Sequence, residues 1–404
     1  MSFQKTVLDN GLTIIGEHNP HAQSFAAGYF VNTGSRDETP ELAGVSHFLE
    51  HMLFKGSDKR SAEDINREFD ELGANNNAYT NEERTVYHAT VVAERGEAML
   101  ELLTDMMRPV LRQSDFDMEK KVILEEIAMY EDRPNFKVFE LGNAQFFDHH
   151  PLGNSVLGSN ESISALSREQ MQAYFDKRYA PNNMVLSLSG NYDWQAMLNL
   201  VNELSQSWKA QVTERRFPGF KPSLGEMTRQ DEKLKRAHVA FYAPGLSAQD
   251  EARYAAFLLS NCIGDSSGSR LYWALLDKGL VDNAYFYHDS NDGLGVYQGY
   301  LSAEPERLAE VTRIFIDTLL DVETNGLLAE EWERAQRKLA TSLTLRAETP
   351  YGRLMSLGPN FLYGNDYQSV DELVEKIFAT RLESALELLA RKPFSNLFTY
   401  TLTP

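Results

Sequence analysis

The chain has 404 residues, of which 42% are hydrophobic and 24% are charged, proportions typical of a globular protein with two or three domains. Its formal net charge of −20 argues against nucleic acid and anionic membrane surfaces as partners, because both would repel it. A single cysteine, Cys262, excludes an internal disulfide. The sequence starts without a basic-then-apolar signal region and contains no apolar stretch long enough to span a membrane, so we expect a soluble, cytoplasmic protein.

Strand and turn signals come first in the chain. Residues 5–18 predict a hairpin that turns at Asp9-Asn10-Gly11, and residues 24–33 alternate apolar and small side chains as a strand does. Residues 39–41, Thr-Pro-Glu, then give a helix-start signal: an N-cap residue, a proline at the first helical position and an early acid. The helix predicted to follow ends at Gly56.

This helix carries His47, Glu50 and His51. The histidines are four residues apart, so their side chains project from one helix face a turn apart, and the glutamate leans over the same face. Two imidazoles and a carboxylate within one turn provide two ligands for a catalytic zinc ion and the base that activates its water. The spacing is the inverted form of the His-Glu-x-x-His zinc signature. The sequence therefore predicts a zinc site here.

Further elements complete a first half of the chain. Ser61 and Gly73 bound a second helix. We expect a strand pair within 75–90, a strand at 184–189, and helices at 92–107, 115–131 and about 160–178. The helix predicted at 115–131 places Glu119 and Glu126 on one face, about 10.5 Å apart along the helix axis. Residues 206–224, rich in proline and glycine, are predicted to be a linker.

The second half repeats the first. Residues 116–134 align without gaps onto 332–350, an offset of 216, and the helix of the two histidines matches 254–264 at an offset near 208. The positions suspected of metal chemistry fall on apolar or small residues in the second copy: Ala255, Leu258, Leu259, Ala335 and Ser342. A purely structural pair of histidines would have no reason to vanish together with a glutamate on another helix. The repeat thus supports a metal site and nominates Glu126 as its third ligand.

With these motifs the chain resembles the inverzincin zinc metallopeptidases, the family of pitrilysin, insulin-degrading enzyme and mitochondrial processing peptidase. In that family a glutamate follows His-x-x-Glu-His, and here Glu126 lies 75 residues after His51, as the family pattern requires. The stretches 77–80, 85–87 and 179–183 match as well. Two halves in one chain of this length resemble the short bacterial branch, whose members pair into dimers around an enclosed chamber.

The resemblance implies a role for each matched residue. Three side chains would bind one Zn²⁺ ion per chain: His47, His51 and Glu126. Glu50 would be the general base, and Glu119 would support the site by contacting a metal ligand rather than the metal itself. Glu125 competes as third ligand, although the family register favours its neighbour. An extended peptide substrate would add to the family's edge strand, here formed by Asn77, Ala78 and Tyr79.

One segment of the second half departs from the family. Active members place an arginine and a tyrosine seven residues apart there, reaching the scissile carbonyl, but Leu276 stands at the arginine's place in this chain. Three explanations remain open: a partner subunit supplies the pair, catalysis is weak, or Arg270, Tyr272 or Tyr285 substitutes. Arg270 has the alternative interpretation of a structural residue in its turn.

We therefore expect an α+β fold of two homologous domains, each a largely antiparallel sheet with helices packed on one face. The zinc-binding catalytic domain would span 1–205, and the domain lacking the metal site 225–404, with 206–224 as linker. The expected function is zinc-dependent cleavage of extended or unfolded peptides by a homodimer, or by a heterodimer with a related chain. The alternatives are a non-catalytic or partner-dependent scaffold subunit of the family, and a metal-storing or metal-sensing protein.

Overall fold

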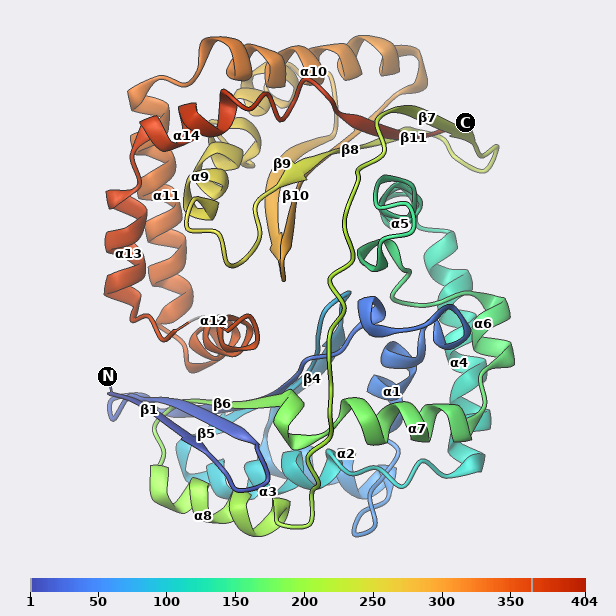
Figure 1. Ribbon diagram of the computed structural model, residues 1–404, viewed down its shortest axis with the longest axis vertical. Helices are drawn as coiled ribbons and strands as arrows, with labels where there is room; N and C mark the ends of the chain where they lie inside the picture. The colour runs from blue at the N-terminus through green and yellow to red at the C-terminus, as the bar shows by residue number, and fades with distance from the viewer. Residues whose placement is uncertain (1, 365) are drawn as a thin grey trace. The chain divides into compact units, whose positions relative to one another are not determined.

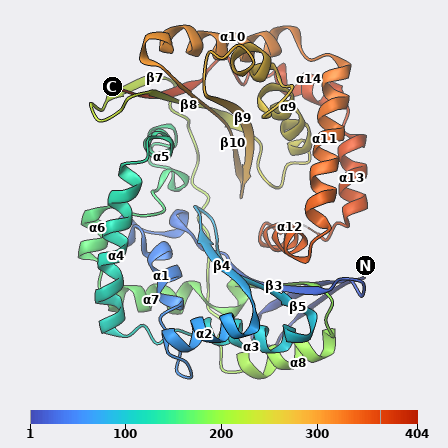
Figure 2. The same ribbon diagram turned by 180° about the vertical axis from the view of Figure 1, so that it is seen from behind.

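The computed structural model describes residues 2–364 and 366–404 (Figures 1 and 2). The chain folds into two compact units, each of which takes pieces from both halves of the sequence. Unit 1 comprises Met1–Ala128, Asn154–Arg216 and Leu345–Tyr367. Unit 2 comprises Met129–Gly153, Phe217–Thr344 and Gln368–Pro404. None of the helices in the described ranges is long and apolar enough to cross a membrane.

Unit 1 is built on a six-stranded sheet in the order β1-β2-β6-β3-β5-β4. Its strands are β1 (Ser2–Val7), β2 (Thr13–His18), β3 (Ser24–Val31), β4 (Asn75–Thr80), β5 (Thr85–Val92) and β6 (Met184–Gly190). Neighbouring strands are antiparallel apart from β2 and β6, which run parallel. The hairpin, the strand that follows it and the later strand pair predicted from the sequence are confirmed.

The helices that begin in unit 1 are α1 (Val45–Leu53), α2 (Ala62–Leu72), α3 (Gly96–Met106), α4 (Gln113–Glu131), α6 (Asn160–Ala165), α7 (Arg168–Arg178), α8 (Trp194–Ser205) and α12 (Pro350–Leu362). The single helix predicted at 160–178 is wrong. It breaks at Leu166, because Ser167 caps a new helix by accepting a hydrogen bond from the N–H of Gln170.

Unit 2 is built on a five-stranded sheet in the order β7-β11-β8-β10-β9. Its strands are β7 (Gly225–Gln230), β8 (Ala237–Gly245), β9 (Asn283–Asn291), β10 (Leu294–Ala303) and β11 (Phe398–Thr403). Here β7 and β11 form the parallel pair. The remaining helices are α5 (Pro134–Phe146), α9 (Arg253–Gly264), α10 (Leu308–Asn325), α11 (Ala329–Ala347), α13 (Val370–Ala379) and α14 (Leu382–Leu389). Short helical turns lie at Ser35–Asp37, Pro40–Leu42, Ala93–Arg95, Pro151–Gly153, Pro181–Asn183, Tyr272–Leu276 and Pro305–Arg307.

The internal repeat predicted from the sequence is visible in the elements. Helices α4 and α11 have the same bounds at an offset of 216, and so do α5 and α12. The parallel pairs, β2 with β6 and β7 with β11, hold equivalent places in the two sheets. The predicted fold class, two homologous domains with largely antiparallel sheets, is therefore confirmed.

The two halves exchange one helix each. On β3, Phe25 faces α3 and α8, whereas the next residue, Ala26, faces the opposite side and packs in a cluster with Leu354 of α12. In the same way α5 covers the face of the second sheet that lies opposite α9 and α10 (Figure 1). Each sheet thus has helices of its own half on one face, as predicted, and a helix of the other half on the second face.

The domain bounds expected from the sequence, 1–205 and 225–404, assign each half of the repeat to one domain and do not include the exchange of α5 and α12. These bounds stay a prediction. Within the described chain, residues 208–224 of the predicted linker lie outside helices and strands. Arg215 in this segment pairs with Asp37, a buried acid that also pairs with Arg178. The first part of the linker belongs to unit 1 and is tied to the rest of that unit by a buried ion pair.

Candidate metal centre and active site

Helix α1 begins later than the sequence predicted. Residues Pro40–Leu42 form a separate 3-10 turn, and Thr39 does not cap α1, which starts directly after Gly44. The buried carboxylate of Glu38 instead accepts hydrogen bonds from the backbone N–H groups of Gly44 and Ser46, both at 2.7 Å. An acid accepting from the first free N–H groups stabilises a helix start. This start is set by a residue six positions upstream, which the local capping rule does not detect.

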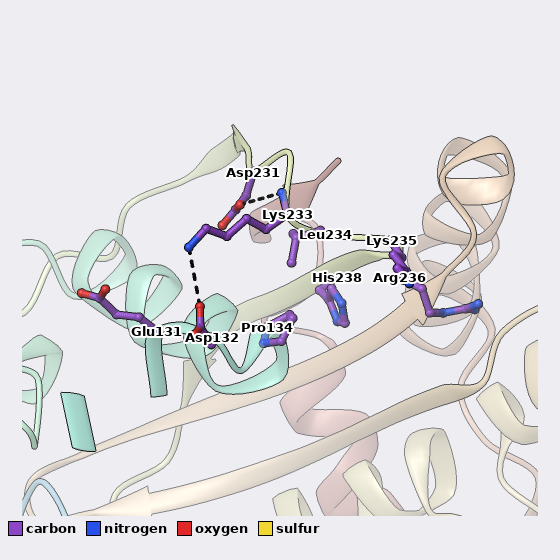
Figure 3. Close-up of a pocket in the computed structure, with 9 residues that line it drawn as sticks. All are labelled: Glu131, Asp132, Pro134, Asp231, Lys233, Leu234, Lys235, Arg236 and His238. Atoms are coloured by element: carbon purple, nitrogen blue, oxygen red, sulfur yellow. Dashed lines mark hydrogen bonds and ion pairs between the residues drawn. The ribbon is translucent and has the colours of Figure 1, made fainter. Parts of the chain in front are cut away.

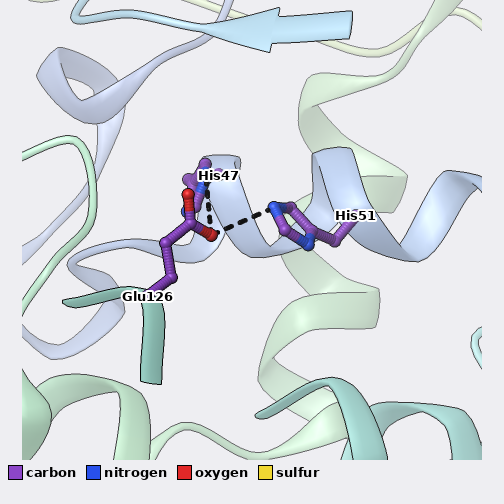
Figure 4. A group of neighbouring side chains, drawn as sticks. All are labelled: His47, His51 and Glu126. Carbon is purple, nitrogen blue, oxygen red and sulfur yellow. Dashed lines mark ion pairs between the residues drawn. The ribbon is translucent and has the colours of Figure 1, made fainter. Parts of the chain in front are cut away.

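Two elements bring the predicted ligands together. His47 and His51 lie one turn apart on α1, with ring centroids 4.8 Å apart, and Glu126 points at both from α4 (Figure 4). The Oε2 atom of Glu126 lies 3.8 Å from His47 Nε2 and 3.5 Å from His51 Nε2. One candidate ligand atom from each residue falls within 4.8 Å of the others, and no second group of this kind occurs in the described ranges. The neighbouring Glu125 is exposed.

The three groups suit a metal ion. Burial, and then the neighbouring His51, lower the pKa of His47 to about 3, so this imidazole is neutral. Its buried Nδ1 has no hydrogen-bond partner among the described residues, and its Nε2 lies too far from Glu126 for a hydrogen bond. The Nε2 atom, which faces Glu126 without a hydrogen bond to it, therefore has a lone pair open to a cation. Two imidazole nitrogens and one carboxylate oxygen are the donor set of open catalytic zinc sites.

The site also attracts positive charge at its second histidine. Burial by itself lowers the pKa of His51, but its hydrogen bond to Glu119 and the charges of Glu126, Glu119 and Glu50 outweigh burial and raise that pKa above the usual value. A proton or a metal ion can satisfy this attraction. Because a metal requires the free nitrogen, it competes with the proton.

Glu119 lies behind His51. Its Oε1 accepts a hydrogen bond from Nδ1 of His51 at 2.9 Å, and its Oε2 contacts the Nζ of Lys55 at 2.5 Å. Burial raises the pKa of Glu119, but the bonds from His51 and Lys55 more than offset this and leave it lowered, so the carboxylate is ionised. With the proton of His51 held on Nδ1, the Nε2 lone pair is left for a metal.

Glu50 lies on α1, beside the three candidate ligands. Its Oε2 accepts a hydrogen bond of 2.6 Å from the hydroxyl of Thr80 on β4. Burial raises the pKa of Glu50, and Thr80 and the charge of His51 reduce the shift only in part. Sequence reasoning missed both Thr80 and Lys55. For Thr80 the signal was alternation along the strand, since it points to the same face as Ala78; for Lys55 it was its place one turn after His51.

The predicted substrate strand is β4. It forms an edge of the sheet and, among the described strands, pairs with β5 alone. The backbone N–H of Ala78 is directed to the side-chain oxygen of Asn77 at 2.9 Å, which places it on the side away from β5. The ring of Tyr79 packs under α12. The free edge of β4 therefore leads directly to Thr80 and Glu50.

The second-half candidates are engaged inside unit 2. Arg270 donates to Glu331 through Nε at 2.8 Å and Nη2 at 2.9 Å, and to Asp321 through Nη1 at 2.5 Å. The ring of Tyr285 stacks against Phe139 and packs at a tilt against Tyr300. These contacts match the structural interpretation of Arg270.

Unit 2 also contains a charged hollow of about 240 Å³ (Figure 3). It is lined by Glu131, Asp132, Pro134, Asp231, Lys233, Leu234, Lys235, Arg236 and His238. Four of its charged residues form ion pairs: Lys233 with Asp132, Asp231 with Lys137, and Arg236 with Asp282. Because the two charges within each pair neutralise each other, the cluster around His47 is the stronger candidate for a catalytic site.

Comparison with known proteins identifies the family. Residues 13–160 match the family model described as insulinase, peptidase family M16, and residues 165–339 match the model of the peptidase M16 inactive domain. An uncharacterized zinc protease of Bacillus subtilis, YmxG, is 32% identical, covering 98% of this chain and 96% of that protein. The chain belongs to the M16 peptidase family. Another zinc protease, from Streptomyces coelicolor, is 32% identical over 97% of this chain and 88% of its own.

Several solved structures share the fold. A protease from Helicobacter pylori superposes with a TM-score of 0.93 at 17% identity, with full coverage of both chains. A putative M16-like peptidase from Alicyclobacillus acidocaldarius gives 0.87 at 22% identity, covering 100% of this chain and 98% of its own. A chain of complex III from Candida albicans gives 0.83 at 18%, covering 99% and 95%. The two family models and the bacterial zinc-protease relatives confirm the resemblance to the short bacterial branch of the inverzincins.

Proposed function

We propose that this chain is a zinc-dependent endopeptidase that cleaves extended or unfolded peptides, with Glu50 as the general base. The observation that carries the proposal is the convergence of two imidazole nitrogens and one carboxylate oxygen beside a second carboxylate. The zinc-protease names of its relatives support the same reaction class.

The chain's own groups divide the work. Held by His47, His51 and Glu126, one Zn²⁺ ion per chain would supply a Lewis acid that polarises the scissile carbonyl and acidifies water. Glu50 accepts the proton of the attacking water and delivers it to the nitrogen of the leaving amine. Burial, which raises the pKa of Glu50, makes it a better base, and the hydrogen bond from Thr80 fixes its orientation.

The substrate is an extended peptide. It adds to β4 as a further strand, with its backbone paired to the free edge at Ala78, which carries the peptide toward Glu50. Only a segment with unpaired backbone groups can bind in this way, so folded proteins are poor substrates.

The competing function is a non-catalytic or partner-dependent subunit. Two observations favour it: Leu276 replaces the family's arginine, and Arg270 is committed to Glu331 and Asp321. A complete set of candidate ligands with an adjacent base favours catalysis, and it suits a metal store or sensor poorly because those functions need no base.

For the assembly we propose a dimer of about twice 45.8 kDa, either of identical chains or with a related chain that supplies the missing arginine and tyrosine. The exposed edge of β4 is an aggregation hazard unless it is enclosed. Light scattering and a peptide assay on the same sample test this, and a stable, fully active monomer would contradict it. A cytoplasmic location stays a prediction.

The function is tested with the zinc-loaded chain, a quenched-fluorescent unfolded peptide and the variant Glu50→Gln. The variant should keep its zinc and lose about 10²–10⁴ in turnover, because the amide keeps the shape of the side chain but accepts no proton. Glu125→Gln, the matched change at the exposed neighbour of the proposed ligand, should cleave normally. Near-normal turnover by Glu50→Gln would remove Glu50 from the mechanism. Zinc binding without any cleavage, relieved by a related chain, would support the partner-dependent alternative.

A further inference from the structure

We propose that Lys55 is a positioning residue of the metal centre, acting on His51 through Glu119. The proposal rests on the proposed zinc function but concerns a side chain that contacts neither the candidate ligands nor Glu50 in the structure. Its ammonium group contacts Glu119 Oε2 at 2.5 Å.

The backbone of Lys55 is fixed. The residue follows the end of α1 at Leu53, and its N–H donates to the carbonyl of Met52 at 3.1 Å. Its own carbonyl accepts a hydrogen bond from Arg112 Nη1 at 3.3 Å. The side chain is one-third exposed, so the ammonium is partly hydrated while it reaches the buried carboxylate. The lysine is thus held in place from both sides.

Glu119 divides its two oxygens between two donors. Oε1 accepts from Nδ1 of His51, and Oε2 faces Lys55. The terminal torsion of a glutamate is broad, so one hydrogen bond alone leaves the carboxylate plane poorly fixed. A second donor on the other oxygen fixes that plane. The side chain of Glu119 is only 5% exposed, so water is a poor replacement for the lysine.

The orientation of Glu119 matters for metal binding. Its Oε1 holds the proton of His51 on Nδ1 and keeps the Nε2 lone pair directed toward Glu126. If the carboxylate turns, the ring of His51 loses its fixed acceptor and the proton can move to the nitrogen that the metal needs. Loss of such an outer partner costs about 10–100-fold in metal affinity.

Electrostatic repulsion alone predicts the opposite change in zinc affinity when Lys55 is removed. Lys55 carries a positive charge next to a site for a cation, so its removal would strengthen zinc binding if charge were all that mattered. Positioning predicts weaker binding. The direction of the change in affinity therefore decides between the two effects.

The experiment measures Zn²⁺ affinity of the full chain by competition with a chromophoric chelator. Lys55→Met should bind zinc about tenfold or more weakly, and Lys55→Arg, which keeps the charge and a donor, should restore most of the loss. Lys59→Met, at an exposed lysine in the same loop, is the control and should bind normally. The zinc-free Lys55→Met protein should still unfold cooperatively, at a somewhat lower temperature because Glu119 loses one of its two partners. The visible spectrum of the Co²⁺-substituted protein should change only in Lys55→Met.

A double-mutant cycle tests the route. In a Glu119→Gln background, Lys55→Met should cause little further loss, because both changes break the same chain of contacts. If Lys55→Met does not fold, Lys55→Gln enters the same cycle with the same expected direction. Unchanged or tighter zinc binding by Lys55→Met, or a full additional loss in the Glu119→Gln background, overturns the positioning role. Failure of the unaltered chain to bind zinc overturns the proposed function instead.

Discussion

Glu126→Gln should abolish the stabilisation of the protein by zinc without weakening the zinc-free protein. The carboxylate of Glu126 faces the Nε2 atoms of His47 and His51, and its charge also raises the pKa of Glu50. In the absence of a metal this negative charge repels that of Glu50. Replacing it with a neutral amide relieves the repulsion, and at the same time removes the third candidate ligand.

The size of the effect follows from linkage. A ligand that binds only the folded state at about 100 times its Kd stabilises that state by about 2.7 kcal/mol. For a folded region of about 200 residues, the size of unit 1, each kcal/mol shifts the melting temperature by about 2–4 °C. Zinc should therefore raise the Tm of the unaltered chain by about 5–11 °C. At a pH above the titration of His51, where Glu126 no longer faces a protonated imidazole, the zinc-free variant should melt at or slightly above the zinc-free parent.

Differential scanning calorimetry with and without added zinc measures both quantities on one sample, and Glu125→Gln provides a control of equal charge change. Glu125 is exposed, so its variant should keep the full zinc-dependent shift. The assignment of the third ligand is wrong if Glu125→Gln loses the shift and Glu126→Gln keeps it. A Glu126→Gln variant that melts well below the parent in the absence of zinc would show that the carboxylate has a structural role instead.

Three further outcomes test the site and its support. Zinc affinity should fall as the pH drops from about 8 to about 5.5, because the raised pKa of His51 keeps a competing proton in place; an affinity that is flat in equilibrium dialysis contradicts this. Ala78→Pro removes an N–H from the free edge of β4, so it should keep zinc but lose most peptide cleavage, and normal kcat/KM would refute the edge-strand model. Arg353→Met removes the charge that balances buried Glu17 and should cost about 3–5 kcal/mol in denaturant unfolding, whereas a loss below about 1 kcal/mol would show that the pair is not what holds α12.

The candidate ligands were predictable because helix geometry is local. A spacing of four residues from His47 to His51 places both side chains on one face of any helix, whatever the rest of the fold. The repeat extended this reasoning to α4, since its bounds recur in α11 at the predicted offset of 216. Ser61 and Gly73 marked the ends of α2 correctly for the same reason: capping is decided within one turn of helix.

What the sequence did not reveal depends on contacts between distant residues. The start of α1 is set by Glu38, which caps it across an intervening 3-10 turn. The exchange of α5 and α12 was also hidden, because an apolar helix face indicates burial but not which sheet provides the partner surface. Lys55 lies one turn after His51 but beyond the end of α1, so helix spacing alone does not assign it to the site. It became visible only when Glu119 was seen to have a second oxygen that needed a donor.

The second half of the chain shows what a metal site costs the fold. On α9 the positions equivalent to the motif are fully or nearly fully buried in the core of unit 2: Ala255, Leu258 and Leu259. Burying a leucine side chain contributes about 1.5–3 kcal/mol. Unit 1 gives up this apolar packing on α1 and places there a buried, neutral histidine and a half-buried carboxylate, whose pKa values are displaced mainly by desolvation. Such an arrangement is unfavourable for a protein without a bound cation and persists only where the site has a use. Because both copies lie in one chain with one backbone plan, the contrast argues for metal binding independently of any relative.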